Sequence, residues 1–402
     1  MAYVVSTGMT GFGDRDESLG ELMALAANHC IENSDVDRNG IDGLVASNAL
    51  GGEMGMQTGV QNYLSSRLGI NGYSRRVGQT SAGGAAAFKE GCSLVDSGKD
   101  DVVLVVGGEK MTHLGTSRSS DVISSVIHPD EYRHGLTMPA FAGLVADLYI
   151  NETDATRKDL ARVAVENHGK ALRNPDAQFG KDLSEEDVLN SPLVADPLRL
   201  YDFCPTTDGA AAVLMVSDDR LREDLESGAS HGVSRVAAVA GTNDTHAVHD
   251  RDTPLSLKAV RESRRDAYQE AGISTEDIDV LELHDMFTAL ELIQLEDLGF
   301  YNHGKGWRYV RREEDNGSSD GSSDGTTGDG DVPVINPSGG LKARGHPLAA
   351  TGLAQIVELH RQITNEAGER TVNDASVGVA CNLAGYGNAA ITTVMDEPGV
   401  ER

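Results

Sequence analysis

One stretch joins a strand-like segment to a helix-like segment: residues 77–88, Val77-Gly78-Gln79-Thr80-Ser81-Ala82-Gly83-Gly84-Ala85-Ala86-Ala87-Phe88. A strand that runs directly into a helix presents one side chain at the helix N-terminus, where unpaired N–H groups and the helix dipole favour negative charge. Gly83 and Gly84 allow other backbone or a ligand to come close. Ser81 is therefore a candidate nucleophile. Helix capping, the commoner role of serine at such a position, is the alternative.

The order of strand-like and helix-like segments is repeated later in the chain. Residues 236–242 repeat the pattern of 3–7, residues 257–271 that of 19–30, and residues 278–281 that of 41–44. This duplication predicts a layered α-β-α-β-α fold made of two halves related by a pseudo-twofold axis. We place the halves at 1–232 and 233–402, with a helical lobe at about 111–200 inserted in the first. In such folds, sites form where loops at the strand ends converge.

The composition is strongly acidic, with 63 acidic and 34 basic residues among 402 and a formal charge of -29. A globular chain of this kind suits a salt-rich, halophilic cytoplasm, where ions screen the repulsion. The same charge argues against nucleic acid and anionic membranes as partners. The four cysteines are scattered without CxxC spacing, which argues against disulfides and a structural metal. With neither a secretory signal nor a long apolar run, we expect a soluble cytoplasmic protein.

Residues 315–331 form an acidic, low-complexity segment without apolar side chains. This composition predicts a solvated, disordered surface loop. A calcium-binding loop would need regularly spaced ligands and a closing glutamate, which the segment does not have.

Three further clusters follow strand-like runs in the second half. His284 leaves a buried strand and precedes Asp285, so it is either a polarising group or a core histidine. His346 stands between Gly345 and Pro347 at a helix start, and this stiff placement suits a general base. Cys381 ends an apolar strand before a glycine-rich turn and is either a small core residue or a reactive thiol.

Several separated motifs, in this order, resemble the thiolase superfamily over essentially the whole chain: residues 81–88, 107–111, Asn167-His168, 208–211, His284-Asp285-Met286-Phe287, 336–340, Gly345-His346-Pro347 and 381–387. The His-Asp-x-Phe motif is similar to that of archaeal and sterol-carrier-protein-type thiolases. In this family, the turn before the first-half helix normally carries a cysteine nucleophile.

The resemblance implies a role for each matching residue. Ser81 takes the place of the cysteine acyl carrier, in preference to Thr80, which fits the glycine spacing but loses the downstream register. His346 activates the carrier, His284 stabilises an oxyanion or enolate, and Cys381 removes a proton from the second substrate. The substrate-binding residues implied are Gly339, Gly340, Gly385 and Met138. No metal is implied.

The resemblance also implies the activity and the partners. The expected enzyme is an acetyl-CoA C-acyltransferase (β-ketothiolase) that uses coenzyme A thioesters as substrates and has no permanently bound cofactor. A homodimeric core and a small zinc-ribbon/OB-fold partner subunit are expected. One alternative is a degenerate homologue that binds acyl-CoA or serves as a scaffold. Another is a hydroxymethylglutaryl-CoA synthase, which would need a cysteine nucleophile and a glutamate base that are not found here.

Overall fold

The computed structural model of the chain describes residues 1–55, 57–226, 232–312 and 332–399. Its core is a ten-stranded sheet with the strand order β10-β9-β11-β12-β8-β1-β7-β4-β2-β3. The first half supplies β1 (Ala2–Met9), β2 (Gly43–Ser47), β3 (Tyr73–Val77), β4 (Val102–Glu109) and β7 (Gly209–Ser217). The second half supplies β8 (Ser234–Asn243), β9 (Val280–Glu282), β10 (Val334–Ile335), β11 (Val377–Ala384) and β12 (Ala389–Asp396). The acidic segment 315–331 lies outside the described residues.

The two halves have the same pairing pattern. In the first, β1 and β4 are antiparallel to β7, and β2 is parallel to both β4 and β3. In the second, β8 and β11 are antiparallel to β12, and β9 is parallel to both β11 and β10. The halves join where Tyr3 and Val4 of β1 pair with Arg235 and Ser234 of β8. The repeat read from the sequence is thus a repeat of strand order and direction.

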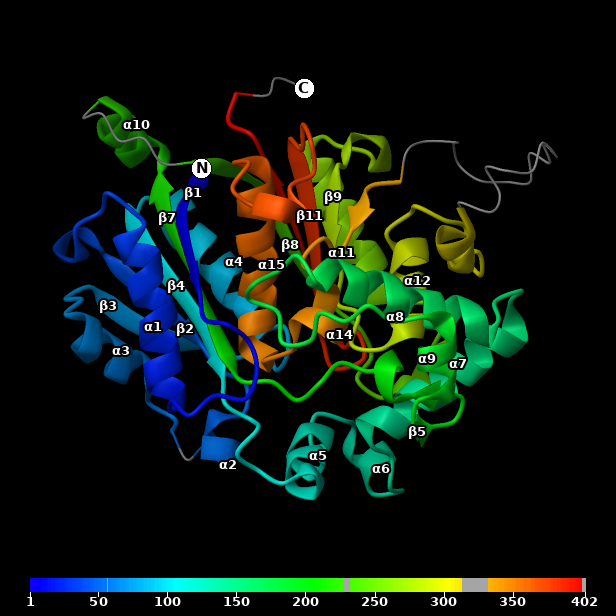
Figure 1. Cartoon of the computed structure of the whole chain (residues 1–402). Helices are drawn as coiled ribbons and strands as arrows, with labels where there is room; N and C mark the ends of the chain where they lie inside the picture. Colours follow the sequence, from blue (N-terminus) through cyan, green and yellow to red (C-terminus); the bar gives the residue numbers. More distant parts are fainter. Residues whose placement is uncertain (56, 227–231, 313–331, 400–402) are drawn as a thin grey trace.

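Helices form three layers around the two halves of the sheet (Figure 1). α1 (Leu19–Glu32) and α3 (Val60–Leu68) pack on the outer face of the first half. α11 (Lys258–Ala271) and α12 (Thr288–Asp297) pack on the outer face of the second half. α4 (Gly83–Asp96) and α15 (Leu348–Ile363) lie between the halves, in one core with strands of both. This arrangement confirms the predicted layered fold. Strands such as β4 are buried along their whole length because helices cover both faces.

The two central helices touch through glycines. A Cβ at Gly84 of α4 would lie 2.5 Å from the Ala349 carbonyl oxygen of α15. A Cβ at Gly352 of α15 would lie 2.5 Å from the Ala85 nitrogen of α4. Each glycine therefore permits a backbone approach that a side chain would prevent. The contact brings the N-terminal ends of α4 and α15 together.

Residues 111–200 form a mostly helical region that packs against α12 of the second half. It contains α5 (Thr116–Ser124), α6 (Pro129–Tyr132), α7 (Met138–Glu152), α8 (Arg157–Ala171) and α9 (Glu185–Asn190), with the short strands β5 (Leu193–Ala195) and β6 (Leu198–Arg199). Apolar side chains of α7 and α8 share a core with α12 of the second half. None of the helices in the described residues is both long and apolar enough to cross a membrane.

Gly84→Ala tests the contact between the central helices. The added methyl group has no room against the α15 backbone, so we expect the free energy of unfolding to fall by about 1–3 kcal/mol. The midpoint of chemical unfolding measures this loss. Gly169→Ala in α8 is the matched control, because no atom lies within 4 Å of the added Cβ. An equal loss in both variants would contradict the close contact.

Candidate active site

The turn before α4 carries two hydroxyl groups in unlike surroundings. Thr80 has a φ of 45°, a left-handed conformation that is unusual for a threonine. Its Oγ1 is buried and has no hydrogen-bond partner among the described residues. The Ser81 hydroxyl donates to the Leu383 carbonyl (2.8 Å) and accepts from the Gly385 N–H (3.2 Å). The helix cap is Ala82, without a side-chain hydrogen bond, so the capping alternative for Ser81 is wrong.

His346 lies just before α15, with its ring held by a neighbouring hydroxyl. Its Nδ1 is 2.7 Å from Thr351 Oγ1, and that hydroxyl donates its proton to the Pro347 carbonyl (3.1 Å). In this tautomer the Thr351 oxygen accepts from Nδ1–H and the lone pair lies on Nε2. Burial, with a smaller effect of Arg344, lowers the pKa of His346 to about 3. The neutral ring can accept a proton at Nε2.

His284 lies two residues beyond β9, and its ring proton is on the other nitrogen from that of His346. The Asn382 side-chain amide donates to its Nδ1 (3.0 Å), so the proton is on Nε2. That Nε2 is buried and has no partner in the described part of the chain. Burial first, then His346 and Arg344, place the pKa of His284 well below its ordinary value. The two rings meet edge to face, with centroids 4.9 Å apart. The pair thus offers one proton acceptor and one proton donor.

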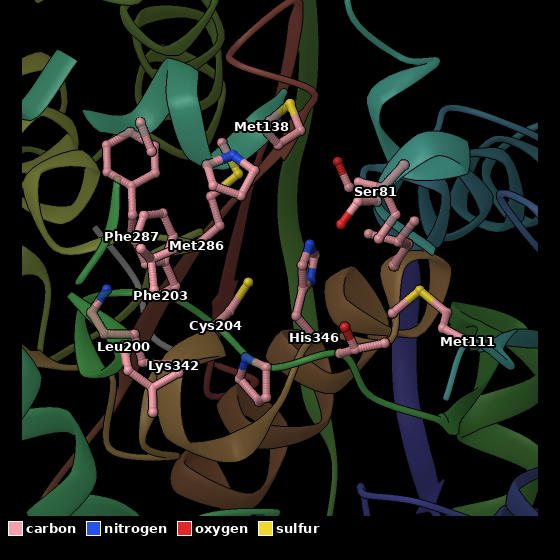
Figure 2. A pocket seen from close by; sticks show the side chains of 18 of the residues that line it. Ser81, Met111, Met138, Leu200, Phe203, Cys204, Met286, Phe287, Lys342 and His346 are labelled. Carbon is pink, nitrogen blue, oxygen red and sulfur yellow. The ribbon is translucent and has the colours of Figure 1, made fainter. Parts of the chain in front are cut away.

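A cavity of about 470 Å³ lies next to this turn. Figure 2 shows the His346 ring between Ser81 and Met111 on one side and Phe203, Met286 and Phe287 on the other. The predicted residues that line it are Ser81, His346, Met138 and Gly385, together with Thr80. The structure therefore brings residues from both halves and from the helical region around one space.

Gly339 and Gly340, predicted to bind substrate, do not line this cavity. They have φ angles of 97° and 61° and begin α14 (Gly340–Arg344). A Cβ at Gly340 would lie 2.5 Å from Asp285 Oδ2, and a Cβ at Gly339 would lie 2.5 Å from Ala171. The two glycines allow the start of α14 to pack closely against Asp285 and Ala171, and this packing positions Lys342 and Arg344.

Cys381 is not brought to the cavity either. Alternate residues of β11 face opposite sides, so Asn382 reaches His284 whereas Cys381 packs in the apolar core shared with α11 and α12. Burial raises the pKa of this thiol to about 12. Its position gives no support to the predicted proton-abstracting role.

Several polar cavity residues receive no role from the sequence, among them His168, Cys204 and Lys342. His168 Nδ1 contacts the Phe179 carbonyl (2.9 Å), and burial lowers its pKa to about 4. Lys342 Nζ donates to the Asp285 carbonyl (2.8 Å) and lies 3.5 Å from Asp285 Oδ2. The sequence does show Asn167-His168 as a family motif. It gives no comparable signal for Cys204 or Lys342, because neither residue directly follows a strand-like run, as the candidate histidines do.

Buried ion pairs hold the second-half elements of the site. Arg344 pairs with Glu282 at the end of β9 (3.1 Å), and Ser338 also bonds to that carboxylate (2.8 Å). The described residues contain no cluster of three or more His, Cys, Asp or Glu side chains that could hold a metal ion.

Comparisons with known proteins decide the family. Residues 2–219 match the family "Thiolase, N-terminal domain", and residues 240–397 match "Thiolase C-terminal domain-like". The chain belongs to the thiolase family. It is 36% identical over 390 residues to acetyl-CoA acetyltransferase from Methanothermobacter thermautotrophicus, covering 96% of this chain and 97% of that protein. It is 30% identical over 408 residues to human sterol carrier protein 2, covering 98% of this chain and 71% of that protein. These relatives confirm the archaeal and sterol-carrier-type resemblance and the expectation of an acyltransferase.

Solved structures agree with this thiolase fold. The Ltp2-ChsH2(DUF35) aldolase superposes with a TM-score of 0.79 at 22% identity, covering 100% of this chain and 99% of that one. Human mitochondrial 3-ketoacyl-CoA thiolase superposes with a TM-score of 0.72 at 16% identity, covering 99% of each chain. At these identities, the likeness shows the fold alone.

The buried, neutral state of His346 makes stability depend on pH. The imidazole of the unfolded chain takes up a proton below its ordinary pKa of 6.5, whereas the folded one, with a pKa of about 3, does not. The contribution of this imidazole to the free energy of unfolding is fully present above pH 6.5 and is lost as the pH falls toward 3. Relative to His346→Gln, wild type should lose about 1.4 kcal/mol of unfolding free energy between pH 7.5 and 5.5.

Chemical unfolding at several pH values measures this difference. His134→Gln is the control, because it removes an imidazole that is exposed in the folded state. A His346→Gln curve parallel to that of wild type would contradict the buried neutral state.

Proposed function

We propose that this thiolase is an acetyl-CoA C-acyltransferase that condenses acetyl-CoA with an acyl-CoA to give 3-ketoacyl-CoA and CoA, or runs the reverse thiolysis. The observation that carries the proposal is the placement of the Thr80–Ser81 hydroxyls and the neutral His346 ring around one cavity. The names of relatives, among them acetyl-CoA acetyltransferase from Methanothermobacter thermautotrophicus, support the substrate class.

In the first step, a turn hydroxyl attacks the thioester carbonyl of the acyl-CoA. A C–O bond forms, the C–S bond breaks, and the hydroxyl proton passes to His346 Nε2 and from there to the leaving CoA sulfur. His284 is fully buried and does not line the cavity; its Nε2, which has no partner in the described residues, could donate to the oxyanion only if the thioester carbonyl reaches past the His346 ring. A hydroxyl needs such a base more than a thiol does, because it is far from ionised near neutral pH.

In the second step, a base removes a proton from the methyl carbon of acetyl-CoA, and the resulting carbanion attacks the acyl ester. A C–C bond forms, and the carrier C–O bond breaks. The proton taken from acetyl-CoA then returns to the hydroxyl. Because Cys381 packs in the core, we assign this proton to His346, whose Nε2 is free again after the first step.

Two hydroxyls compete for the role of acyl carrier. Ser81 is the residue that the sequence predicts, and it would have to release its bonds to Leu383 and Gly385 before it could attack. Thr80 Oγ1 has no such partners among the described residues. Its left-handed backbone is the kind of local strain that proteins keep at functional positions. These features favour Thr80 as carrier and Ser81 as the residue that fixes the turn.

Thiolysis of acetoacetyl-CoA by Thr80→Val and Ser81→Ala tests the proposal. If Thr80 is the carrier, Thr80→Val should lower kcat/KM about a hundredfold or more, because valine keeps the shape but has no nucleophile. Ser81→Ala should lower it less, through a looser turn. The assay uses molar salt, as the acidic composition suggests.

The opposite ranking of these variants would make Ser81 the carrier, as predicted from the sequence. Unchanged activity in both variants would rule out a hydroxyl carrier. Absence of activity in wild type, with acyl-CoA still bound, would favour the degenerate acyl-CoA-binding or scaffold homologue.

We also propose a homodimeric core and a small zinc-ribbon/OB-fold partner. One thiolase-fold neighbour, the Ltp2-ChsH2(DUF35) aldolase, has two components in its name, which loosely supports a second subunit. Light scattering of the purified chain should give twice 42.5 kDa. Addition of a co-encoded small protein should raise the mass and the thiolysis rate together. A monomer whose rate does not respond would contradict this assembly.

A further inference from the structure

Three groups at the turn before α4 have the roles that hydrolases combine for acyl transfer. A turn hydroxyl, from Thr80 or Ser81, lines the cavity together with the His346 ring. The Thr351 hydroxyl lies 2.7 Å from His346 Nδ1 and holds the ring with the Nε2 lone pair available. A nucleophilic hydroxyl, a base and a group that orients the base are the parts of a serine-hydrolase triad, which is recognised by geometry and roles. The site therefore has the parts for transfer of an acyl group to water.

The carrier atom decides where the acyl group goes next. An oxygen ester is less reactive toward thiols and carbanions than a thioester, because oxygen donates its lone pair to the carbonyl carbon more strongly than sulfur does. Transfer of an acyl group from CoA to a hydroxyl is thus downhill, and its return to the CoA sulfur is uphill. Release of the acyl group to water gives a carboxylate and is downhill again. A hydroxyl carrier therefore favours hydrolysis over return of the acyl group to CoA.

The cavity has a polar and solvent-exposed part. Besides the reacting groups, its lining includes four side chains with hydrogen-bonding atoms: His168, Lys181, Tyr201 and Thr206. Lys181 and Thr206 are exposed, and Lys181 Nζ donates to the Tyr201 hydroxyl (3.4 Å). A space of about 470 Å³ holds several water molecules, because each takes up about 30 Å³ in the liquid. Water can therefore enter the site once CoA has left it.

We infer that this protein also hydrolyses acyl-CoA to a free carboxylic acid and CoA, a thioesterase activity that runs through the acyl ester of the turn hydroxyl. The inference rests on the proposed function in taking a turn hydroxyl as the acyl carrier. It goes beyond the proposed function because the acceptor of the acyl group is water, in place of CoA or the carbanion of acetyl-CoA.

The hydrolytic step needs no group beyond those already in the site. The oxygen of a water molecule forms a bond to the ester carbonyl carbon, and a proton of that water passes to His346 Nε2. The bond between the carbonyl carbon and the turn oxygen then breaks, and the turn oxygen takes the proton from His346. A carboxylic acid leaves and the hydroxyl is restored. In sum, acyl-CoA and water give a carboxylic acid and CoA.

Incubation of acetyl-CoA with the protein in molar salt, without a second substrate, tests the inference. Acetate, measured by NMR, should form at least about a hundredfold faster than in protein-free buffer. Acetoacetyl-CoA, separated by chromatography, reports condensation independently. His346→Gln removes the base, so it should lower the rate of acetate formation about a hundredfold or more. Acetate formation at the protein-free rate would overturn the inference.

Replacement of the carrier hydroxyl by a thiol tests the role of the carrier atom. Thr80→Cys and Ser81→Cys each place a thiol on the turn, and exchange of labelled CoA into acetyl-CoA measures the return of the acyl group. In the variant that replaces the carrier, the ratio of exchange to hydrolysis should rise at least about tenfold, because a protein thioester and acyl-CoA are energetically alike. An unchanged ratio in both variants would contradict an oxygen carrier that directs the acyl group to water.

Cys204→Ser is the matched control for a thiol in the cavity. Cys204 lines the cavity, whereas the other three cysteines are buried away from it. Because the inferred carrier is a hydroxyl, this variant should leave both hydrolysis and exchange unchanged. Loss of hydrolysis in Cys204→Ser would assign the acyl group to a thiol and overturn the inference.

Thiolysis of acetoacetyl-CoA, measured on the same preparation, separates this inference from the proposed function. Thiolysis without acetate formation would keep the proposed function and overturn the thioesterase activity. Acetate formation that depends on His346, without thiolysis or condensation, would support the thioesterase activity and overturn the proposed acyltransferase.

Discussion

The close contact between α4 and α15 is the constraint on which the rest of the structure depends. Gly84 and Gly352 face each other's helix backbone, and a Cβ at either would lie 2.5 Å from it. Because α4 begins just after the Thr80–Ser81 turn and α15 begins just after His346, this contact brings the turn beside the histidine. The Thr80 and Ser81 hydroxyls of the first half and the His346 ring of the second half line one cavity because the two helix backbones can touch.

Burial then determines the chemistry of the histidines. Both His284 and His346 have strongly lowered pKa values because the folded protein excludes water from their rings. Their partners make them different: a hydroxyl accepts from Nδ1 of His346, whereas an amide donates to Nδ1 of His284. Two neutral imidazoles thus present one lone pair and one N–H. In ordinary thiolases a thiol is the carrier, and a hydroxyl at this place depends more on such a base.

Much of this organisation can be read from the sequence. The duplicated order of segments predicts the repeated strand pairing, and the position of His346 at a helix start predicts its place at the cavity, whereas His284 is buried behind it. Each of these features depends on a few neighbouring residues. The general rule that sites form at the carboxyl ends of strands then places them together. The family motifs are also short runs of neighbouring residues, and their order along the chain predicts the family.

Other properties depend on contacts between residues far apart in the chain. Ser81 and Thr80 are adjacent and chemically alike. Only the Ser81 hydroxyl forms hydrogen bonds with Leu383 and Gly385, which lie some 300 residues later in the chain. Cys381, the thiol expected at the site, packs in the core because of the alternation of β11, whereas Cys204, for which the sequence indicates no role, lines the cavity beside Met286. The sequence by itself determined the elements and the family. Only the tertiary structure decided which hydroxyl is held by hydrogen bonds and which thiol meets the cavity, because side-chain direction and hydrogen-bond partners are set by packing between the two halves.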